Sequence, residues 1–277
     1  MRPKHKQFET QHARIFGDAS VVQAYRYRPP YVPETFEILL GLIDPDAEFR
    51  AVLDAGCGPG VIARELVQAV DRVDAVDVAA RMLEAGKALP GGDNPKLHWI
   101  QGPIEQVSLQ PPYALIVTAA SLHWMHWETT LSRFHDILTP GGHLAVVEDI
   151  TEPMPWNNDL SYIADYSLNK DFQPYDMLTV TQELAERGLF ERRGLKTTAT
   201  VSFRQSLDDY VESFHARNGL SRDRMAANAA REFDEILRGL VSPHCPDGVV
   251  ELQIKARVIW GKPKPGGPHP PTPSPIE

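Results

Sequence analysis

Hydrophobic and polar residues alternate along the first 150 positions in a pattern that predicts strands and helices in turn. Short apolar runs are typical of buried strands, and apolar residues at helical spacing are typical of amphipathic helices. The expected strands are residues 50–60, 72–79, 97–102, 114–120 and 143–150. The expected helices are residues 33–43, 61–70, 80–89 and 129–139. Because the connections are short, this order predicts βαβ units and a parallel sheet with helices on both faces.

The rhythm changes after residue 150. Residues 151–180 are rich in Trp, Asn, Asp and Tyr, which predicts an irregular or helical lid insertion. The later pattern predicts helices at 181–190, 206–216 and 225–240 and strands at 196–205 and 249–261. The two late strands would complete the same sheet, so we expect one α/β domain over residues 1–260. Residues 261–277 are rich in proline and poor in apolar side chains, which predicts a disordered tail.

Composition narrows the classes of protein. The net charge of −9 argues against a basic face for nucleic acid. The apolar runs are too short to span a bilayer, and the basic N-terminus lacks the apolar stretch of a secretory signal. Two cysteines are too few for a disulfide scaffold, so we expect reduced thiols and a cytoplasmic protein. We expect it to be a monomer or a homodimer with no nucleic-acid or membrane partner.

The sequence VLDAGCGPG at residues 52–60 ends an expected strand with three glycines, Gly56, Gly58 and Gly60. Glycines here would let a ligand approach backbone amides at the N-terminus of the following helix. The loop therefore predicts a binding site for a nucleotide or a related ligand.

Three ligands compete for this loop. A P-loop requires Lys-Ser/Thr after its last glycine, where this chain has Val61 and Ile62, so that interpretation fails. A dinucleotide site has G-x-G-x-x-G, but the third glycine comes one residue early here. Asp54, two residues before the first glycine, would oppose a pyrophosphate and favour a cation. S-adenosylmethionine carries an ammonium and a sulfonium and no phosphate, so it fits best.

Asp77 ends the next expected strand, about twenty residues beyond the loop. A carboxylate there can accept hydrogen bonds from both ribose hydroxyls. NAD and S-adenosylmethionine sites share this spacing, so Asp77 indicates a nucleoside, and the form of the first loop decides which one.

Four segments in this order, DAGCGPG, VDAVDVAARML, ALIVTAA and LTPGGHLAVVE, resemble the class I S-adenosylmethionine-dependent methyltransferases. The resemblance covers residues 20–150 strongly and the remainder loosely. It implies a Rossmann-like, doubly wound, seven-stranded sheet that is mostly parallel, with one antiparallel strand near the edge. It also implies S-adenosyl-L-methionine as the cofactor.

The resemblance also assigns roles to individual residues. The methionine part of the cofactor would be surrounded by Asp54, Ala55, Gly56, Gly58 and Gly60. Asp77 would hold the ribose, and Val78 and Met82 would pack on the adenine. The loop after the third strand has Pro103 where the family often has Asp, so the resemblance leaves the Ile104 amide and Glu105 as the candidates for contact with the adenine amine. Ala119, at the end of the fourth strand, completes the expected cofactor site.

The segment SLHWMHW at residues 121–127 follows the fourth strand, next to the expected position of the transferred methyl group. His123 and Trp124 are therefore candidates for the acceptor pocket, whereas His126 and Trp127 are expected to pack. A metal site is not expected, because the sequence places no third ligand near the two histidines.

His123 is the candidate catalytic residue, because histidine can act as a base near neutral pH. Carboxyl methyltransferases of the trans-aconitate and malonyl-carrier-protein type are similar here, with Leu-Gln-Trp where this chain has Leu-His-Trp. The aromatic wall is kept, but a neutral amide is replaced by a titratable ring. Whether His123 takes a proton or only shapes the wall stays open.

The N-terminal arm, residues 20–32, contains AYRYRPPY. Tyr25 and Arg28 are expected to fold over the cofactor, with Arg28 pairing a carboxylate of the cofactor or of the substrate. Tyr31, and Trp156 from the lid insertion, are expected to line the substrate pocket. Methyltransferases similar to this one often carry a Tyr…Arg-Pro…Tyr element before the first helix.

One motif is rejected. PPY at residues 111–113 resembles part of the [DN]PP[YF] motif of enzymes that methylate amino groups of DNA and RNA. That motif follows the fourth strand, whereas PPY precedes it here.

Three functions remain open. The first is S-adenosylmethionine-dependent O-methylation of a carboxylate or hydroxyl on a small molecule. The second is C- or N-methylation of an aromatic or natural-product scaffold. The third is a non-catalytic cofactor-binding protein of the same fold.

Overall fold

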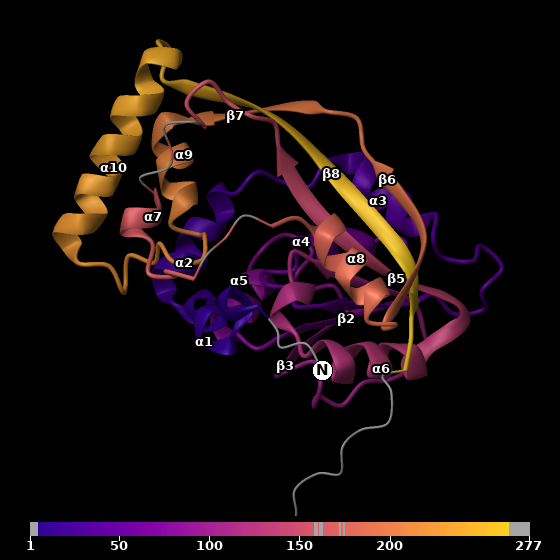
Figure 1. The fold of residues 1–277 in the computed structure, drawn as a ribbon. Coiled ribbons are helices and arrows are strands. Elements are labelled where there is room, and N and C mark those ends of the chain that lie inside the picture. The colour runs from indigo at the N-terminus through magenta and orange to yellow at the C-terminus, as the bar shows by residue number, and fades with distance from the viewer. Residues whose placement is uncertain (1–4, 158–159, 161–162, 172, 174, 266–277) are drawn as a thin grey trace, which may run out of the picture.

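A twisted sheet of eight strands forms the centre of the chain (Figure 1). The computed structural model describes residues 5–157, 160, 163–171, 173 and 175–265. The strands are β1 (Ala51–Ala55), β2 (Arg72–Asp77), β3 (Leu97–Gln101), β4 (Tyr113–Ala119), β5 (Leu138–Thr151), β6 (Phe190–Thr197), β7 (Val201–Ser206) and β8 (Val249–Pro263). The α-helices are α1 (Thr10–Ala13), α2 (Ala19–Ala24), α3 (Pro33–Leu40), α4 (Val61–Leu66), α5 (Ala80–Lys87), α6 (Trp127–Ile137), α7 (Ile163–Tyr166), α8 (Met177–Glu186), α9 (Leu207–Phe214) and α10 (Ala227–Val241). The 3-10 turns are η1 (Lys6–Phe8), η2 (Arg14–Gly17), η3 (Tyr25–Tyr27), η4 (Leu122–Trp124) and η6 (Ser242–His244).

The order of the strands determines where a ligand can bind. The sheet runs β3-β2-β1-β4-β5-β8-β6, and β7 also pairs with β8. Strands β1 to β5 are parallel to one another, and β8 is antiparallel to β5, β6 and β7. The chain moves outward from β1 to β3 and then returns to the other side of β1 with β4. Such a reversal leaves a crevice at the carboxyl ends of β1 and β4. The predicted doubly wound, mostly parallel fold is confirmed.

Apolar side chains bury the sheet between two layers of helices. Helices α3, α4 and α5 cover one face, where their side chains pack with those of β1 and β4. Helices α6 and α8 cover the other face, over β1, β4 and β5. The long strand β8 extends beyond these layers toward α9 and α10, which form a further apolar cluster with the first half of β8 (Figure 1).

The structure differs from the expected elements in the second half. The run at 196–205 forms the ends of two strands, because β6 and β7 both pair with β8 but are separated by a bulge. Thr197 lies opposite Arg257 and Val201 opposite Ile254, so three residues face two on the partner strand. The hydroxyl of Thr198 accepts the Ala256 amide at 2.9 Å within this bulge.

Two element ends are also corrected. Residues 138–139, expected to end a helix, and residues 140–142, expected to stop it, instead begin β5, with Leu138 opposite Tyr113. Strand β8 runs to Pro263, which lies opposite Phe190, so residues 261–263 are paired strand and not tail. Residues 266–277 of the expected tail, and 158–159, 161–162, 172 and 174 of the expected lid insertion, lie outside the described residues.

Within the described part of the chain, no helix has the length and apolar character that a bilayer crossing requires.

Candidate functional site

The turn after β1 brings the backbone close to the carboxyl end of β4. Gly56, Gly58 and Gly60 all have positive φ angles, of 72°, 54° and 71°. A Cβ atom on Gly56 would lie 2.5 Å from the Cβ of Ser121, closer than two carbon atoms can approach. Glycine is therefore required at position 56 by both conformation and space.

Asp54 lies in β1 just before this turn and is buried, with 1% of its surface exposed. Its Oδ2 accepts the Ala63 amide of α4 at 3.1 Å, and its Oδ1 has no hydrogen-bond partner among the described residues. Burial, with a smaller contribution from the charge of Asp77, raises the pKa of Asp54 to about 7. A buried carboxylate oxygen without a donor would be stabilised by a cationic ligand.

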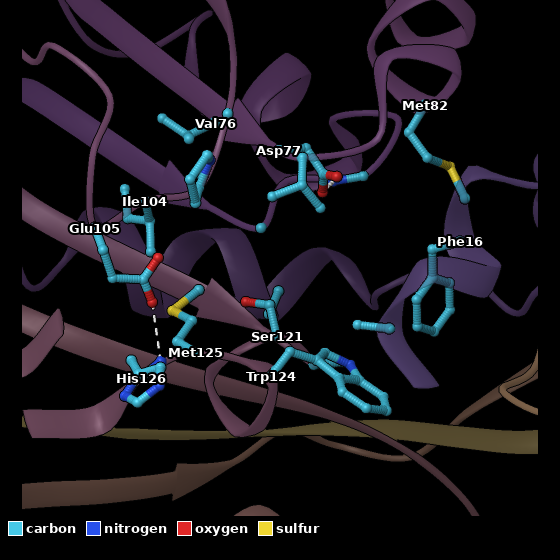
Figure 2. Close-up of a pocket in the computed structure, with 18 of the residues that line it drawn as sticks. Phe16, Val76, Asp77, Met82, Ile104, Glu105, Ser121, Trp124, Met125 and His126 are labelled. Atoms are coloured by element: carbon cyan, nitrogen blue, oxygen red, sulfur yellow. Dashed lines mark hydrogen bonds between the residues drawn. The ribbon is translucent and has the colours of Figure 1, made fainter. Parts of the chain in front are cut away.

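Asp77 lies at the carboxyl end of β2 and lines the cavity (Figure 2). Its Oδ2 accepts the Gly58 amide at 2.8 Å, and its Oδ1 accepts the Ala79 amide at 2.8 Å. Burial raises the pKa of Asp77, although the backbone amides of Ala79, Gly58 and Val78 act in the opposite direction. The carboxylate is thus held rigidly beside the glycine turn, where it can accept hydroxyl groups of a ligand.

A cavity of about 570 Å³ opens at the reversal point of the sheet. This volume is typical of small-molecule and cofactor sites. Figure 2 shows Met82 and Phe16 on one side of it, and Glu105 and His126 on the other. The predicted site residues that line this cavity are Tyr25, Arg28, Gly56, Gly58, Asp77, Val78, Met82, Pro103, Ile104, Ala119 and Trp124.

Val78 and Met82 form an apolar part of the wall. Val78 is 58% exposed, which is unusual for a valine that directly follows a central strand. Met82 is buried against α2 and η2 in a small apolar cluster. An apolar surface next to a carboxylate suits a nucleoside. The base can pack on the apolar side chains, and the ribose hydroxyls can donate hydrogen bonds to the carboxylate of Asp77.

Several wall residues were not found from the sequence. Phe16, from η2, lies 5.8 Å from Trp124 between ring centroids and brings a distant N-terminal segment to the cavity. His126 was expected to pack, but it is exposed and lines the cavity. Its amide donates to Glu105, which also accepts the Thr130 hydroxyl, both at 2.9 Å. The only indication in the sequence was the expected position of Glu105 near the adenine; nothing in it indicated that Glu105 bonds to the segment containing His126.

His123 was expected on the cavity wall, but it is not among the residues that line the cavity. It is 2% exposed, and its Nε2 lies 3.0 Å from the hydroxyl of Tyr175. The ring of Phe8 lies 5.0 Å from the imidazole and the ring of Trp124 lies 4.7 Å from it, as measured between centroids. The N-terminal segment and the approach to α8 therefore cover His123, and Trp124 alone of the pair faces the cavity.

Two expected pocket residues lie elsewhere. Trp156 is 2% exposed and donates its indole N–H to the Tyr210 hydroxyl at 3.0 Å, inside the apolar cluster under α9 and α10. Trp156 follows the end of β5 at Thr151 and packs into this cluster, so it does not line the cavity. Tyr31 packs between the apolar cluster of α3 and that of α9.

Three expected cofactor residues support the cavity from behind. Asp54 and Ala55 belong to the buried strand β1. A Cβ atom on Gly60 would lie 2.4 Å from the indole of Trp99, so Gly60 allows close packing of the turn on β3.

Arg28 lines the cavity next to Tyr25. Its Nη2 donates to Oδ2 of Asp149 at 3.1 Å, and its guanidinium carbon lies 5.1 Å from the centre of the Tyr25 ring. These contacts orient the guanidinium at the boundary between the cavity and the end of β5.

Tyr113 of the rejected PPY motif has a structural role. It is fully buried, and its hydroxyl donates to Asp74 at 2.5 Å, far from the cavity wall. In the part of the chain that the structure describes, no group of three His, Cys, Asp or Glu side chains could hold a metal ion.

Comparisons with known proteins agree with this geometry. Residues 52–142 match a family described as a methyltransferase domain. An uncharacterised methyltransferase of Mycobacterium tuberculosis is 36% identical over 104 residues, covering 37% of this chain and 52% of that protein. A malonyl-[acyl-carrier protein] O-methyltransferase of Halalkalibacterium halodurans is 34% identical over 108 residues, covering 36% of this chain and 40% of that protein. The chain thus spans about half or less of the length of these curated relatives.

The fold has a similar solved structure. A proposed type II methyltransferase of Anaeromyxobacter dehalogenans superposes with a TM-score of 0.62 and 20% identity, covering 85% of this chain and 97% of that chain. At this identity the similarity establishes the shared fold. Residues 52–142, which contain the glycine turn, Asp77 and part of the cavity wall, are thus similar to a methyltransferase domain.

Proposed function

We propose that this chain transfers a methyl group from S-adenosylmethionine to an oxygen atom of a small-molecule acceptor. The observation that carries the proposal is that Asp77, the apolar side chains of Val78 and Met82, and the aromatic side chain of Trp124 all line the same cavity. Asp77, Val78 and Met82 suit a nucleoside, and Trp124 suits an acceptor bound beside it.

The chain's own residues would bind the cofactor as follows. Asp77 would accept the ribose hydroxyls, and Val78 and Met82 would pack on the adenine. The buried Oδ1 of Asp54, which lacks a donor among the described residues, fits a cofactor that carries an ammonium group. The amide of Ile104 would contact the adenine edge.

When bound, S-adenosylmethionine supplies an electrophilic methyl group on a sulfonium sulfur. The residues of the chain then need to orient the acceptor oxygen and exclude water. Trp124, Phe16 and Tyr25 supply the aromatic surface for this purpose. We assign His123 as a positioning residue, because it is packed behind Trp124 and bonded to Tyr175.

Oxygen is favoured as the acceptor atom by two observations. One relative is an O-methyltransferase that acts on malonyl-[acyl-carrier protein]. A carboxylate acceptor is already deprotonated near neutral pH, so it needs orientation but no base. A carboxylate acceptor therefore agrees with a cavity whose wall does not include the imidazole of His123.

The test is a metabolite extract incubated with methyl-labelled S-adenosylmethionine and the purified protein. We expect label in a base-labile ester or in an ether of a small molecule, and little label with the Asp77→Asn variant. Label on nitrogen or carbon would overturn the choice of oxygen. Tight binding of S-adenosylhomocysteine without transfer to any component would favour a non-catalytic cofactor-binding protein.

A further inference from the structure

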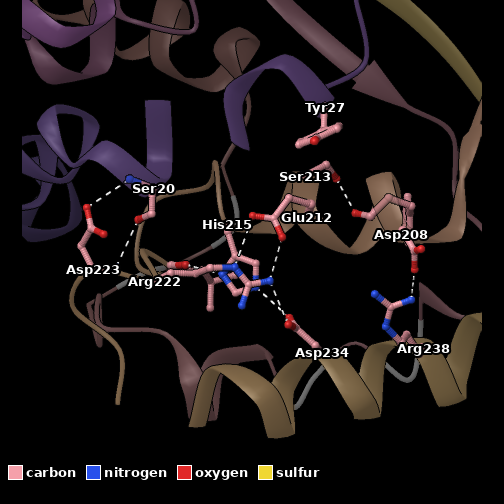
Figure 3. Close-up of polar contacts among 12 residues, drawn as sticks. Ser20, Tyr27, Asp208, Glu212, Ser213, His215, Arg222, Asp223, Asp234 and Arg238 are labelled. Atoms are coloured by element: carbon pink, nitrogen blue, oxygen red, sulfur yellow. Dashed lines mark hydrogen bonds and ion pairs between the residues drawn. The ribbon is translucent and has the colours of Figure 1, made fainter. Parts of the chain in front are cut away.

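The loop between α9 and α10, residues 215–226, is held in place by a dense polar network (Figure 3). His215 is fully buried, with Nδ1 2.7 Å from the Leu220 carbonyl oxygen and Nε2 2.8 Å from Asp234 of α10. Arg222 donates to both Glu212 and Asp234 at 2.8 Å. A loop tied to both helices in this way presents its side chains in a defined geometry.

The same loop is tied to the N-terminal arm. Arg224 forms an ion pair with Asp18 at 2.6 Å, and the Ser20 amide donates to Asp223 at 3.1 Å. Helix α9 also packs against η3, the turn that ends just before Arg28. The loop and α9 are therefore fixed against the segment that carries Tyr25 and Arg28, although no residue of the loop lines the cavity itself.

The arginines of this loop differ in their partners. Arg222 and Arg224 both pair with carboxylates. Arg217 has no carboxylate partner among the described residues, and its guanidinium carbon lies 3.9 Å from the centre of the Phe214 ring. Because Phe214 is fully buried, this stacking fixes the plane of the guanidinium and leaves its N–H groups available.

Arg217 lies within electrostatic range of the ion pair between Arg28 and Asp149. Burial, and in addition the charge of Arg28, lower the pKa of Arg217, whereas Tyr210 and Asp149 act in the opposite direction. Asp149 is already paired with Arg28 at 3.1 Å. Arg217 is nevertheless accessible to solvent. A crowded, accessible guanidinium without a counter-ion is stabilised by an anionic ligand, and its fork of N–H groups matches a carboxylate.

We propose that Arg217 binds a carboxylate group of the methyl acceptor, so that the acceptor is an organic acid. This inference rests on the proposed methyl transfer and specifies its substrate class. Arg28, which pairs with Asp149, remains at the cavity wall, and Arg217 supplies the unpaired positive charge. The acid group would either be the methylated group itself or hold the acceptor while another oxygen reacts.

The experiment measures binding without turnover. The protein is saturated with S-adenosylhomocysteine and titrated with benzoate and glutarate, each compared with its uncharged amide, by calorimetry at constant ionic strength. We expect at least one acid to bind about tenfold tighter than its amide, as a charged hydrogen-bonded pair would provide. Arg217→Gln should reduce this preference to about twofold or less, and Arg217→Lys should keep part of it.

The matched control is Arg231→Gln, which removes an exposed arginine of α10. It should leave the acid preference unchanged, and thermal melts should show that all variants are folded. The proposal is overturned if the wild type shows no acid preference, or if Arg217→Gln retains it. It is also overturned if Arg217→Gln weakens S-adenosylhomocysteine about tenfold, because Arg217 would then hold the cofactor. Failure of the wild type to bind S-adenosylhomocysteine at all would instead refute the proposed function, and the inference with it.

Discussion

The hydroxyl of Tyr175 lies 3.0 Å from Nε2 of His123, and the two rings lie 4.9 Å apart between centroids. Tyr175 is 38% exposed, whereas His123 is almost completely buried. The phenol of Tyr175 is therefore accessible to solvent, and it covers the buried imidazole of His123. A histidine in the segment after β4 thus supports the aromatic wall and does not face the cavity.

Tyr175→Phe tests the energetic value of this contact. The variant keeps the ring, which lies 4.7 Å from Phe8, but removes the hydroxyl beside His123. We expect the free energy of unfolding to fall by about 1 kcal/mol, as for one part-buried hydrogen bond. Urea denaturation measures the change. Tyr27→Phe is the matched control because the Tyr27 hydroxyl accepts an exposed hydrogen bond from the neighbouring Arg26, and its loss should change stability much less. Equal effects of the two substitutions would contradict the prediction.

His123→Gln separates a positioning role from a base. Loss of a general base typically lowers the rate by about 10²- to 10⁴-fold. We expect a decrease of less than about tenfold, with an unchanged pH profile of kcat, because the imidazole does not reach the cavity. The measurement uses the acceptor that the extract assay identifies. A steeper loss with a shifted pH profile would restore His123 as the base.

The cofactor half of the site could be predicted because its residues follow short motifs on neighbouring strands. Gly58 and Asp77 come at the ends of β1 and β2, and the ends of adjacent parallel strands meet at one edge of the sheet. The acceptor half depends on segments that are distant in the sequence. No local pattern indicates that Phe8 and Tyr175 converge on His123, or that Arg217 comes close to Arg28.

The fold shows the same division. Strands β1, β2 and β4 were predictable because their apolar runs are buried on both faces. The bulge at Thr198 was not, because the β-branched run at 196–205 has uniform strand propensity. Its interruption follows from the pairing with β8, where one residue is in excess.

Asp77→Asn tests the predicted ribose contact. Asparagine keeps one acceptor oxygen for the Gly58 or the Ala79 amide but loses the charge that both amides and a ligand would share. We expect the Kd for S-adenosylhomocysteine to rise about 10- to 100-fold, which corresponds to roughly 1.5–3 kcal/mol for hydrogen bonds to a charged group. Calorimetry measures the Kd. Asp46→Asn, on an exposed loop, should leave it unchanged.

Gly56→Ala should destabilise the protein through both space and conformation. The added methyl group would lie 2.5 Å from the Ser121 Cβ, at a φ of 72°. We expect a loss of about 1–3 kcal/mol in the free energy of unfolding. Gly239→Ala is the opposite control, because its Cβ meets nothing within 4 Å and Gly239 lies inside α10. That substitution should stabilise by about 0.5–1 kcal/mol. If Gly56→Ala and Gly239→Ala changed the free energy of unfolding by similar amounts, a side chain at position 56 would not strain the turn after β1.

Asp54 should make the stability of the ligand-free protein depend on pH. Its pKa is raised to about 7 in the folded state, against about 3.9 in an unfolded chain. The folded state therefore holds the proton more tightly, and this stabilisation is fully present below about pH 4 and lost as the pH rises through about 7. Asp54→Asn, which keeps an oxygen for the Ala63 amide, should lose less stability than the wild type between these values. Parallel urea denaturation curves from pH 4.5 to 8 would measure the difference.

The same carboxyl group should release a proton when the cofactor binds. An ammonium group that meets Oδ1 of Asp54 favours the charged form and lowers its pKa from about 7. Calorimetric titration with S-adenosylhomocysteine at pH 6.5, in buffers of different ionisation enthalpy, should show release of a fraction of one proton. Asp54→Asn should release less, and any remaining release would come from Asp77, whose pKa burial also raises. Equal proton release by both proteins would mean that the ammonium group does not contact Asp54.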